Sequence, residues 1–339
     1  MEKNKILISV VIPLYNKEKT IVHTLSTVIS QTYKLFEVII VNDGSSDNSV
    51  QLINDNFSDS RIRIISQENS GVSVARNKGV EEAKGDWIAF LDADDEWLPD
   101  YLSTLMNALI KYPTAEMIGC SSYYKDLRTG QMNCNALIDR YYHQIVRINY
   151  FINPDRMTHV GATIFKKSTF ICVGGFKTGI RINEDLLLCG LIAMRGNYVY
   201  VGDAFHVYVG GVSGQATSLL QSSDMSNILY VINTLFESNE ANKKYNTLVP
   251  IYLEYRFLHI LLGCLKMNDY EKVNYLLDNI SVKLKKYIGY IDWIKNDKMK
   301  YISIFFIYLK KLIWRKHGFP RVGENSRYSQ IELYKLKQN

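Results

Sequence analysis

Four short apolar runs alternate with amphipathic segments over the first hundred residues of this chain. The runs have the length of β-strands and cover Ile6–Ile12, Phe36–Val41, Arg61–Ile65 and Trp87–Leu91. Runs of this kind are typical of strands buried on both faces of a parallel sheet. Between them, Lys19–Ser30 and Val72–Ala83 place their apolar residues at helical spacing. The alternation predicts right-handed strand–helix–strand units and therefore a doubly wound α/β half-domain.

The polar segments that follow these strands are candidates for a binding site. In open parallel sheets, ligands bind beyond the carboxyl ends of the strands. Such segments follow the first, second and fourth runs, at Pro13–Glu18, Asn42–Asp47 and Asp92–Asp95. None of them contains GxGxxG or GxxxxGK[ST], which argues against a dinucleotide-binding or P-loop NTPase site.

The acidic turn after the fourth run carries three carboxylates, those of Asp92, Asp94 and Asp95. Close carboxylates repel one another, so the turn requires a cation or hydrogen-bond donors. Because no lysine or arginine lies between Lys84 and Lys111, we expect the compensating charge to come from outside the chain. A divalent metal that carries a phosphorylated ligand fits this expectation. The alternative, a helix-capping turn, needs only one carboxylate.

The size and composition of the chain limit its number of domains, its compartment and the partners that it can bind. With 339 residues it can form one large domain and an appendage. The net charge of +6 is concentrated in the last fifty residues, and this bias suits an anionic surface. The five cysteines form no CxxC pair, so we expect reduced thiols and a cytosolic compartment. We find no uncharged apolar stretch of about 18 residues, as a membrane span requires, and no recognition module for nucleic acid.

After residue 115 the strand pattern becomes less regular. Val160–Phe165 and Tyr198–Val209 are the clearest strand candidates, and Leu186–Met194 is an apolar helix that follows Asn183-Glu184-Asp185. Small and polar residues dominate 210–224, which indicates a loop and a domain boundary. Helical periodicity continues from there to about residue 318, and we expect the last twenty residues to be poorly ordered.

Five motifs in the same order resemble those of the family-two inverting glycosyltransferases with a GT-A fold. They are Val10–Asn16, Val41–Asp47, Ala75–Asn77, Leu91–Asp95 and Glu184–Asp185. The similarity covers roughly residues 6–210. It implies a GT-A nucleotide-diphospho-sugar transferase fold, with a Rossmann-like mixed, mainly parallel sheet and a C-terminal helical extension. The expected divisions are a catalytic domain over 1–215, with a nucleotide-binding half 1–114 and an acceptor-binding half 115–215, then a helical region 216–320 and a tail 321–339.

The resemblance also implies a set of residues for the nucleotide-sugar donor. That set comprises Pro13, Tyr15, Glu18, Asp43, Arg76, Asp92 and Ala93. In it, Pro13 and Tyr15 lie beside the base, Arg76 lies near the base and diphosphate, and Asp92 meets the ribose. Asp43 accepts the N3–H of uracil, a task that suits an ionised carboxylate because it is acceptor-only. The residues alone also permit an ordinary turn with a helix N-cap after the second strand, and a solvated helix arginine at position 76.

For the chemistry, the resemblance implies an Mn²⁺ or Mg²⁺ ion on Asp94 and a general base at Asp185, with Glu184 as its orienting neighbour. Such ions take one or two carboxylates plus phosphate oxygens and waters, so one strong protein ligand is enough. The acidic pair could instead cap a helix N-terminus. His206 is a further metal candidate, but its surroundings depart from the Tyr-Arg-x-His pattern of many relatives, and a core histidine is the simpler interpretation.

These assignments predict inverting, metal-dependent transfer of a sugar from a nucleoside-diphosphate sugar, in particular a UDP-sugar, to a growing cell-surface glycan or lipid-linked acceptor. The lack of a Gln-x-x-Arg-Trp sequence and of a transmembrane bundle favours single-sugar addition over processive synthesis. The alternatives are a catalytically silent sugar-nucleotide or glycan-binding module of the same fold, and a nucleotidyltransferase. The latter is weakened by the lack of a Gly-rich basic loop after the first strand. His159 and Arg181 are acceptor-side candidates that nothing in the sequence singles out.

Two apolar helical segments with basic flanks, Phe257–Leu265 and Tyr301–Trp314, leave two interpretations open. An apolar helix face usually packs on the protein core. Alternatively, residues 297–318 contact an anionic inner leaflet, with tryptophan and basic residues at the interface. The second interpretation predicts a cytoplasmic protein that associates peripherally with the inner face of the cell membrane.

Overall fold

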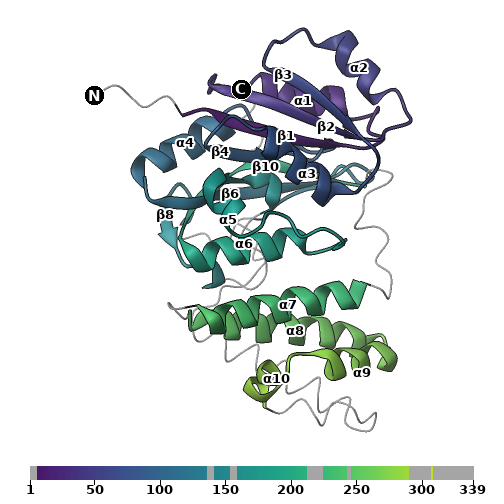
Figure 1. The fold of residues 1–339 in the computed structure, drawn as a ribbon, viewed down its shortest axis with the longest axis vertical. Coiled ribbons are helices and arrows are strands. Elements are labelled where there is room, and N and C mark those ends of the chain that lie inside the picture. Colours follow the sequence, from purple (N-terminus) through teal and green to yellow (C-terminus); the bar gives the residue numbers. More distant parts are fainter. Residues whose placement is uncertain are drawn as a thin grey trace.

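A sheet flanked by helices forms one end of the molecule, and a layer of helices forms the other (Figure 1). The structure is a computed structural model. It describes residues 6–135, 141–152, 159–211, 224–242, 246–289 and 307. The five cysteines, all within these ranges, form no disulfide in this described part of the chain, in agreement with the expected thiols.

The N-terminal half contains the predicted parallel strands. They are β1 (Ile8–Leu14), β2 (Phe36–Asp43), β3 (Ile62–Gln67) and β4 (Trp87–Phe90), in the order β3-β2-β1-β4. All three pairings between them are parallel. Their connections contain α1 (Ile21–Ile29), α2 (Ser49–Asn56) and α3 (Val72–Glu82). Val10 and Val11 are both fully buried, in the cores on opposite faces of the sheet, which explains why β1 is a continuous apolar run.

The sheet continues beyond β4 with strands of mixed direction. These are β5 (Glu96–Trp97), β6 (Ala115–Asp126), β7 (Met132–Asn135), β8 (Ile145–Ile148), β9 (Thr163–Lys166) and β10 (Asn197–Gly210). The order after β4 is β9-β6-β10-β5, with β7 beside β6 and β8 beside β10. β9 is antiparallel to both neighbours, whereas β6 and β10 are parallel. The predicted strand at Tyr198–Val209 is confirmed, but in Val160–Phe165 only the second half is a strand, since Val160–Ala162 forms the 3-10 turn η3.

Helices cover both faces of this mixed sheet. They include α4 (Tyr101–Lys111), α5 (Lys167–Cys172) and α6 (Glu184–Arg195), and the 3-10 turn η2 (Tyr150–Ile152) follows β8. The apolar helix predicted at Leu186–Met194 is confirmed as α6, which begins at the acidic pair. The C-terminal layer consists of α7 (Asp224–Ala241), α8 (Leu248–Lys266), α9 (Tyr270–Asn279) and α10 (Val282–Ile288).

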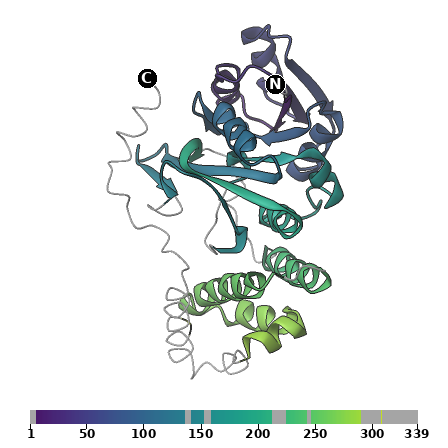
Figure 2. The same ribbon diagram turned by 90° about the vertical axis from the view of Figure 1, so that its left-hand side faces the viewer.

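The C-terminal helices share a hydrophobic core with the sheet domain. One buried cluster runs from Phe151 of η2 and Ile192 of α6 to Leu235 of α7 and Tyr252 of α8. Gly190 allows the close approach of α6 and α7, because a Cβ there would lie 2.6 Å from Cδ2 of Leu235. In Figure 2 the green helices again lie next to the teal α6. The helical region is therefore packed on the sheet domain and shares its hydrophobic core.

Helix α8 contains the segment Phe257–Leu265, for which packing and membrane contact were both open. By length and composition α8 could span a membrane, but 61% of its apolar window is buried inside the protein. The side chains of Phe257, Leu258 and Leu261 are fully buried. The packing interpretation thus holds for this segment. Of the second segment the structure describes only Ile307, which is buried, so residues 297–306, 308–318 and the tail lie outside the described residues.

Candidate functional site

The loops after β1 and β2 are joined by hydrogen bonds into one rim at the carboxyl edge of the sheet. The backbone N–H of Asn16 donates to Oγ of Ser45 (3.1 Å), and that of Lys17 donates to Oγ of Ser49 (2.9 Å). The carboxylate of Glu18 accepts from the backbone and side-chain nitrogens of Asn48, at 3.1 and 3.2 Å. The structure therefore places Glu18, a predicted donor-binding residue, in the contact that fixes the two loops to each other.

Pro13 and Tyr15 lie where β1 reaches this rim. Pro13 is opposite Val41 of β2, one residue before the end of the strand. Tyr15 follows the strand and leaves 50% of its surface exposed. Asn16 turns the chain with φ of 50°, a left-handed conformation that asparagine tolerates. An exposed aromatic ring at a strand end can stack on a base. Tyr15 is thus suited to the predicted contact with a nucleotide base, which stays a prediction.

The buried carboxylate of Asp43 holds the loop that leads into α3. Its Oδ1 accepts from Nε2 of Gln67 (2.8 Å) and from the backbone N–H of Ser70 (2.9 Å), and its Oδ2 accepts from the backbone N–H of Gly71 (2.8 Å). A carboxylate has about four acceptor positions. Asp43 thus orders the start of the helix that carries Arg76 and retains acceptor capacity on Oδ2. Its predicted contact with uracil stays a prediction.

Each carboxylate of the acidic turn pairs with a different basic side chain from elsewhere in the chain. The pairs are Asp92 with Arg76 (2.6 Å), Asp94 with Lys17 (2.7 Å) and Asp95 with His206 (3.1 Å). The expectation that the compensating charge comes from outside the chain is therefore wrong. It failed because the partners lie 16, 77 and 111 positions away in sequence, beyond the local window in which lysine and arginine were sought.

Burial and these partners set the charge on the turn. Burial raises the pKa of Asp94 above its ordinary value, although Lys17 opposes this shift. Burial also raises the pKa of Asp95 to about 6, with His206 opposing. At Asp92 burial acts in the same direction, but the charge and hydrogen bond of Arg76 prevail and lower the pKa. Asp92 is consequently held as a carboxylate, whereas Asp94 and Asp95 are poorly solvated anions.

Asp94 has the chemistry that a divalent metal requires. A desolvated carboxylate with a raised pKa gains from a nearby cation, and carboxylate oxygen is the donor that Mg²⁺ and Mn²⁺ prefer. His206 does not join Asp94 in this structure. Its Nε2 lies 3.1 Å from Asp95 and its Nδ1 lies 3.0 Å from Oγ of Ser122, and His206 and Asp95 are both fully buried. The interpretation of His206 as a buried histidine is thus confirmed.

Arg76 connects the acidic turn to the start of α6. Its Nη2 donates to Asp92 at 2.6 Å and its Nη1 donates to Glu184 at 3.0 Å, with only 3% of the arginine exposed. The guanidinium carbon also lies 5.0 Å from the ring centroid of Phe176. Burial acts to lower the pKa of Arg76, but the two carboxylates raise it above its ordinary value. The alternative of a solvated helix arginine is wrong.

The next residue, Asn77, fastens α3 to the turn before α6. Its Oδ1 accepts from the backbone N–H of Phe176 (2.9 Å), and its Nδ2 donates to the carbonyl of the same residue (2.8 Å). Gly175 adopts φ of 65°, and a Cβ there would lie 2.7 Å from Oδ1 of Asn77. Sequence reasoning assigned no role to Asn77, although it lies within the motif Ala75–Asn77.

The first turn of α6 carries the predicted base. Asn183 precedes it with φ of 61°, and Oδ1 of Asp185 accepts from the backbone N–H of Leu186 at 2.8 Å. Burial raises the pKa of Glu184, and the charge of Asp185 adds to the shift while Arg76 opposes it. The acidic pair therefore does complement the positive end of a helix dipole. Asp185 remains partly exposed beside a neighbour that Arg76 ties to the acidic turn.

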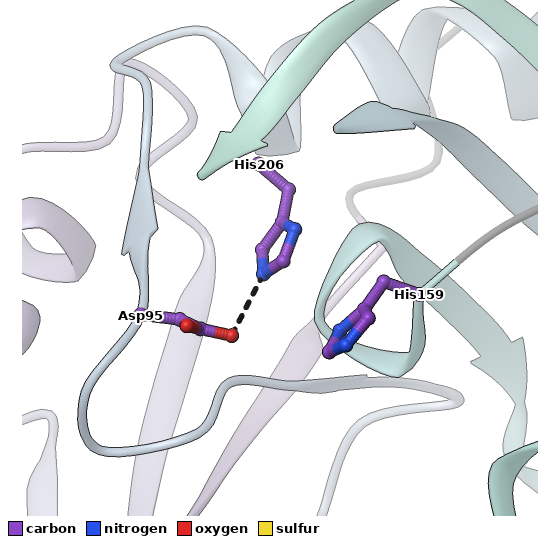
Figure 3. Close-up of side chains that lie close together, drawn as sticks. All are labelled: Asp95, His159 and His206. Carbon is purple, nitrogen blue, oxygen red and sulfur yellow. Dashed lines mark hydrogen bonds and ion pairs between the residues drawn. The ribbon is translucent and has the colours of Figure 1, made fainter. Parts of the chain in front are cut away.

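A second group of potential metal ligands lies behind the acidic turn. Asp95, His159 and His206 come from three separate segments, and their ligand atoms all lie within 4.8 Å of one another (Figure 3). His159 directly precedes η3, and no sequence motif marks it. Arg181, the other acceptor-side candidate, is exposed in the segment before α6.

Comparison with known proteins identifies relatives over much of the chain. The family model described as "Glycosyl transferase family 2" matches residues 9–177. Glycosyltransferase GlyA of Streptococcus pneumoniae is 38% identical over 140 residues, which are 41% of this chain and 20% of the relative. The minor teichoic acid biosynthesis protein GgaB of Bacillus subtilis is 25% identical over 332 residues, 91% of this chain and 35% of the relative. The chain thus spans well under half the length of either relative.

Solved structures share the whole architecture. The crystal structure of S. aureus TarS 1–349 in complex with UDP-GlcNAc has a TM-score of 0.67 at 13% identity, covering 91% of this chain and 92% of that one. The complex of the same protein with UDP has a TM-score of 0.55 at 15% identity and covers 93% of both chains. At these identities the likeness is one of fold, and it confirms the predicted GT-A architecture with its C-terminal helices.

Proposed function

This chain belongs to glycosyl transferase family 2, and we propose that it adds a single sugar, with inversion, from a nucleoside-diphosphate sugar to a growing cell-surface glycan or lipid-linked acceptor. A UDP-sugar is the donor that we infer, since the structurally similar TarS was solved with UDP-GlcNAc and with UDP. Similarity to GgaB, a minor teichoic acid biosynthesis protein, supports an acceptor of the teichoic acid type. The observation that carries the proposal is the Arg76 bridge, which joins Asp92 to Glu184, the neighbour of the base candidate Asp185.

The donor would lie along the carboxyl edge of β1, β2 and β4. Tyr15, which is half exposed, is suited to stack on the base, and the remaining acceptor capacity of Asp43 Oδ2 is suited to the N3–H of uracil. Asp92, held ionised by Arg76, would accept from the ribose hydroxyls. Lys17 adds a cation on the side of the turn where the diphosphate would lie.

In the transfer step, Asp185 removes the proton of the acceptor hydroxyl while the hydroxyl oxygen attacks the anomeric carbon. The bond from that carbon to the diphosphate oxygen breaks, and its electron pair leaves with the diphosphate, so configuration inverts. Glu184, fixed by Arg76, positions the turn that carries Asp185. An Mn²⁺ or Mg²⁺ ion held by Asp94 would supply charge compensation for the leaving diphosphate.

The donor and metal assignments are tested by thermal-shift and calorimetric titrations of the full chain. We expect UDP-sugars to stabilise the protein more than GDP- or dTDP-sugars, and Mn²⁺ to strengthen the effect. An Asp94→Asn variant should lose the metal dependence and keep weak binding of the nucleoside. Stabilisation only by nucleotides without uracil would contradict the role of Asp43, and equal binding with and without metal would contradict that of Asp94.

The base assignment is tested by Asp185→Asn, with UDP release measured across a panel of cell-wall polymers and lipid-linked saccharides. The substitution is nearly isosteric but removes the base, so we expect a loss of about 10²- to 10⁴-fold in turnover. Donor binding by calorimetry should be unchanged. Full activity of this variant would remove the assignment, and donor binding by a wild-type protein that turns over no acceptor would favour a silent binding module.

We also propose that the protein is cytoplasmic and contacts the inner face of the membrane through residues 297–318. Support comes from the basic bias of this segment and from the lipid-linked acceptors expected there. Co-sedimentation with anionic vesicles should decrease in a variant that combines Lys310→Glu, Lys311→Glu and Arg315→Glu. The matched control, Lys283→Glu on α10, should sediment like the wild type. No binding of the wild type, or equal binding of all variants, would contradict the proposal.

A further inference from the structure

We propose that Asp95, His159 and His206 form a second metal site, selective for Zn²⁺-like ions and separate from the catalytic ion at Asp94. Their ligand atoms all lie within 4.8 Å of one another, and Figure 3 shows that the three side chains converge from the acidic turn, the start of η3 and β10. Asp95 and His206 are fully buried, while His159 is partly exposed. This inference does not rest on the transferase activity proposed above.

The spacing of the Asp95–His206 pair suits a shared ion. Nε2 of His206 lies 3.1 Å from Oδ2 of Asp95. If each of these two atoms bound one Zn²⁺ ion at the usual distance of about 2.0–2.2 Å, the ligand–metal–ligand angle would lie roughly between a right angle and the tetrahedral angle. Without an ion, the hydrogen bond between the two atoms holds one proton, carried by either of them. Binding of M²⁺ replaces that proton and releases it to solvent.

The outer contacts of both groups are already in place. Nδ1 of His206 lies 3.0 Å from Oγ of Ser122, which can accept the N–H once Nε2 is a ligand. Oδ1 of Asp95 accepts from the backbone N–H of Val209 at 3.0 Å. Metal-bound histidines and carboxylates almost always have such partners, because these fix the tautomer and the ring orientation.

A glycine allows the backbone of η3 to pack against the ring of His206. A Cβ at Gly161 would lie 2.5 Å from this nitrogen and 3.0 Å from Cδ2 of the same ring. The carbonyl of Gly161 is fixed by Nε1 of Trp97, which donates to it at 2.7 Å. The backbone can therefore lie against the ring only because position 161 has no side chain.

The third ligand, His159, requires a local movement. Its ring lies 5.1 Å from that of His206, with the planes inclined by 17°. Nearly parallel rings cannot both direct a nitrogen at one ion, so His159 must turn about its side-chain torsions, and its partial exposure permits this. Two imidazoles and one carboxylate favour Zn²⁺ and neighbouring first-row ions, whereas the oxygen ligands at Asp94 favour Mg²⁺ or Mn²⁺.

The ion would fasten the acidic turn to β10. Asp95 belongs to the turn that carries Asp94, and His206 is paired with Trp97 and Ser122 on the two strands beside it. A bound ion replaces one hydrogen bond by metal–ligand bonds from three segments. We therefore expect the ion to raise the midpoint of thermal unfolding in the full chain.

The experiment is a titration of the chelator-treated full chain with Co²⁺, followed by its visible absorption, and with Zn²⁺, followed by competition and by thermal shift. We expect stoichiometric Co²⁺ binding with a nitrogen-ligand spectrum that Zn²⁺ displaces. His159→Asn and Ser122→Ala should each weaken binding by at least about tenfold. His159 is partly exposed, so its variant should fold even if replacements of His206 do not.

Two controls distinguish this site from its surroundings. His23→Ala removes an exposed histidine that lies 3.3 Å from Glu96 and should leave Co²⁺ binding unchanged, because in the described part of the chain this pair belongs to no group of three potential ligands. Asp94→Asn should leave the nitrogen-ligand Co²⁺ spectrum unchanged while it removes the Mn²⁺ effect on UDP binding. No Co²⁺ spectrum, a spectrum that survives in His159→Asn, or one that is lost in Asp94→Asn would each overturn the proposal.

Discussion

The two halves of the sheet domain hold their candidate residues in different ways. In residues 6–114, the binding groups follow strand ends and are fixed by neighbouring loops, as in the contact of Lys17 with Ser49. In residues 115–211, Glu184 and His206 are held by side chains of the other half, 108 and 111 positions away. The first half therefore offers a preformed edge for a donor, and the second becomes part of the site only through contacts between the halves.

The largest loss of stability and turnover is expected from Arg76→Gln, which removes a contact between the two halves. The variant leaves the partly buried carboxylates of Asp92 and Glu184 without their common cation. Loss of one partner from a fully buried ion pair typically costs about 3–5 kcal/mol, which is the upper end of the loss expected here. Urea denaturation should show this loss of stability. Under conditions where the variant is folded, turnover should fall more than donor binding, since Glu184 positions the turn of the base.

Lys78→Gln is the matched control for this prediction. Lys78 lies on the exposed side of the same helix, where it pairs with Glu81 at 3.5 Å and Glu82 at 3.4 Å. Exposed pairs of this kind contribute little because solvent screens them. We expect neither stability nor turnover to change. Equal losses in both variants would attribute the effect to the helix and not to the bridge between the halves.

The cost of Arg76→Gln should depend on pH. In the wild type, burial raises the pKa of Glu184 and Arg76 opposes the shift, whereas at Asp92 Arg76 outweighs burial and lowers the pKa. Without the arginine, both carboxylates have higher pKa values in the folded state, so the folded variant binds protons more tightly. Stability that comes from such protonation is present at low pH and is lost as pH rises through the folded pKa.

The difference in unfolding free energy between wild type and Arg76→Gln should therefore be largest at neutral pH. It should shrink as pH falls towards the ordinary pKa values of the two carboxylates, because protonation removes the uncompensated charges. Denaturation curves collected over this pH range would measure the trend. A difference that is independent of pH would mean that packing of the arginine, and not its charge, joins the halves.

The same contrast explains which parts of the molecule the sequence could predict. The strands β1 to β4 are apolar runs because both faces are buried, so periodicity located them and the motifs after them. β6, which lies in the middle of the sheet, was missed because its centre reads Gly119-Cys120-Ser121-Ser122. Its Ser121 is buried and hydrogen-bonded to Tyr200 and to the carbonyl of Gly202, contacts that exist only once β10 is beside it.

The site residues likewise differ in whether the sequence could predict them. Lys17 lies in the polar segment Pro13–Glu18 after β1, and a search for basic residues at every strand end, instead of near the acidic turn alone, could have found it. His159 and the pairing of Arg76 with Glu184 had no local signal, because their partners meet only in the folded chain. The acidic pair at the start of α6 was found through resemblance, whereas its attachment to Asp92 through Arg76 required the structure.

Packing within the first half can be tested by Gly79→Ala, with a smaller expected effect. Gly79 lies one turn after Arg76, and a Cβ there would overlap Cγ1 of Val11 in β1. Displacement of α3 by one methyl group in a packed core typically costs about 1–3 kcal/mol. The variant should lose stability in urea and, by moving Arg76, some turnover. An unchanged midpoint would show that α3 can shift without strain, and would weaken the view of this edge as preformed.

The smallest effect is expected from Gly263→Ala, which supplies the reference for the Gly79 experiment. Gly263 is exposed within α8, and no heavy atom of the described residues lies within 4 Å of the position of an added Cβ. Because alanine restricts the unfolded chain and suits a helix interior, we expect stabilisation by about 0.4–1 kcal/mol with unchanged turnover. The same substitution is thus expected to destabilise the protein in α3 and to stabilise it in α8. A loss of stability at Gly263 would show that backbone effects, and not the contact with Val11, dominate both measurements.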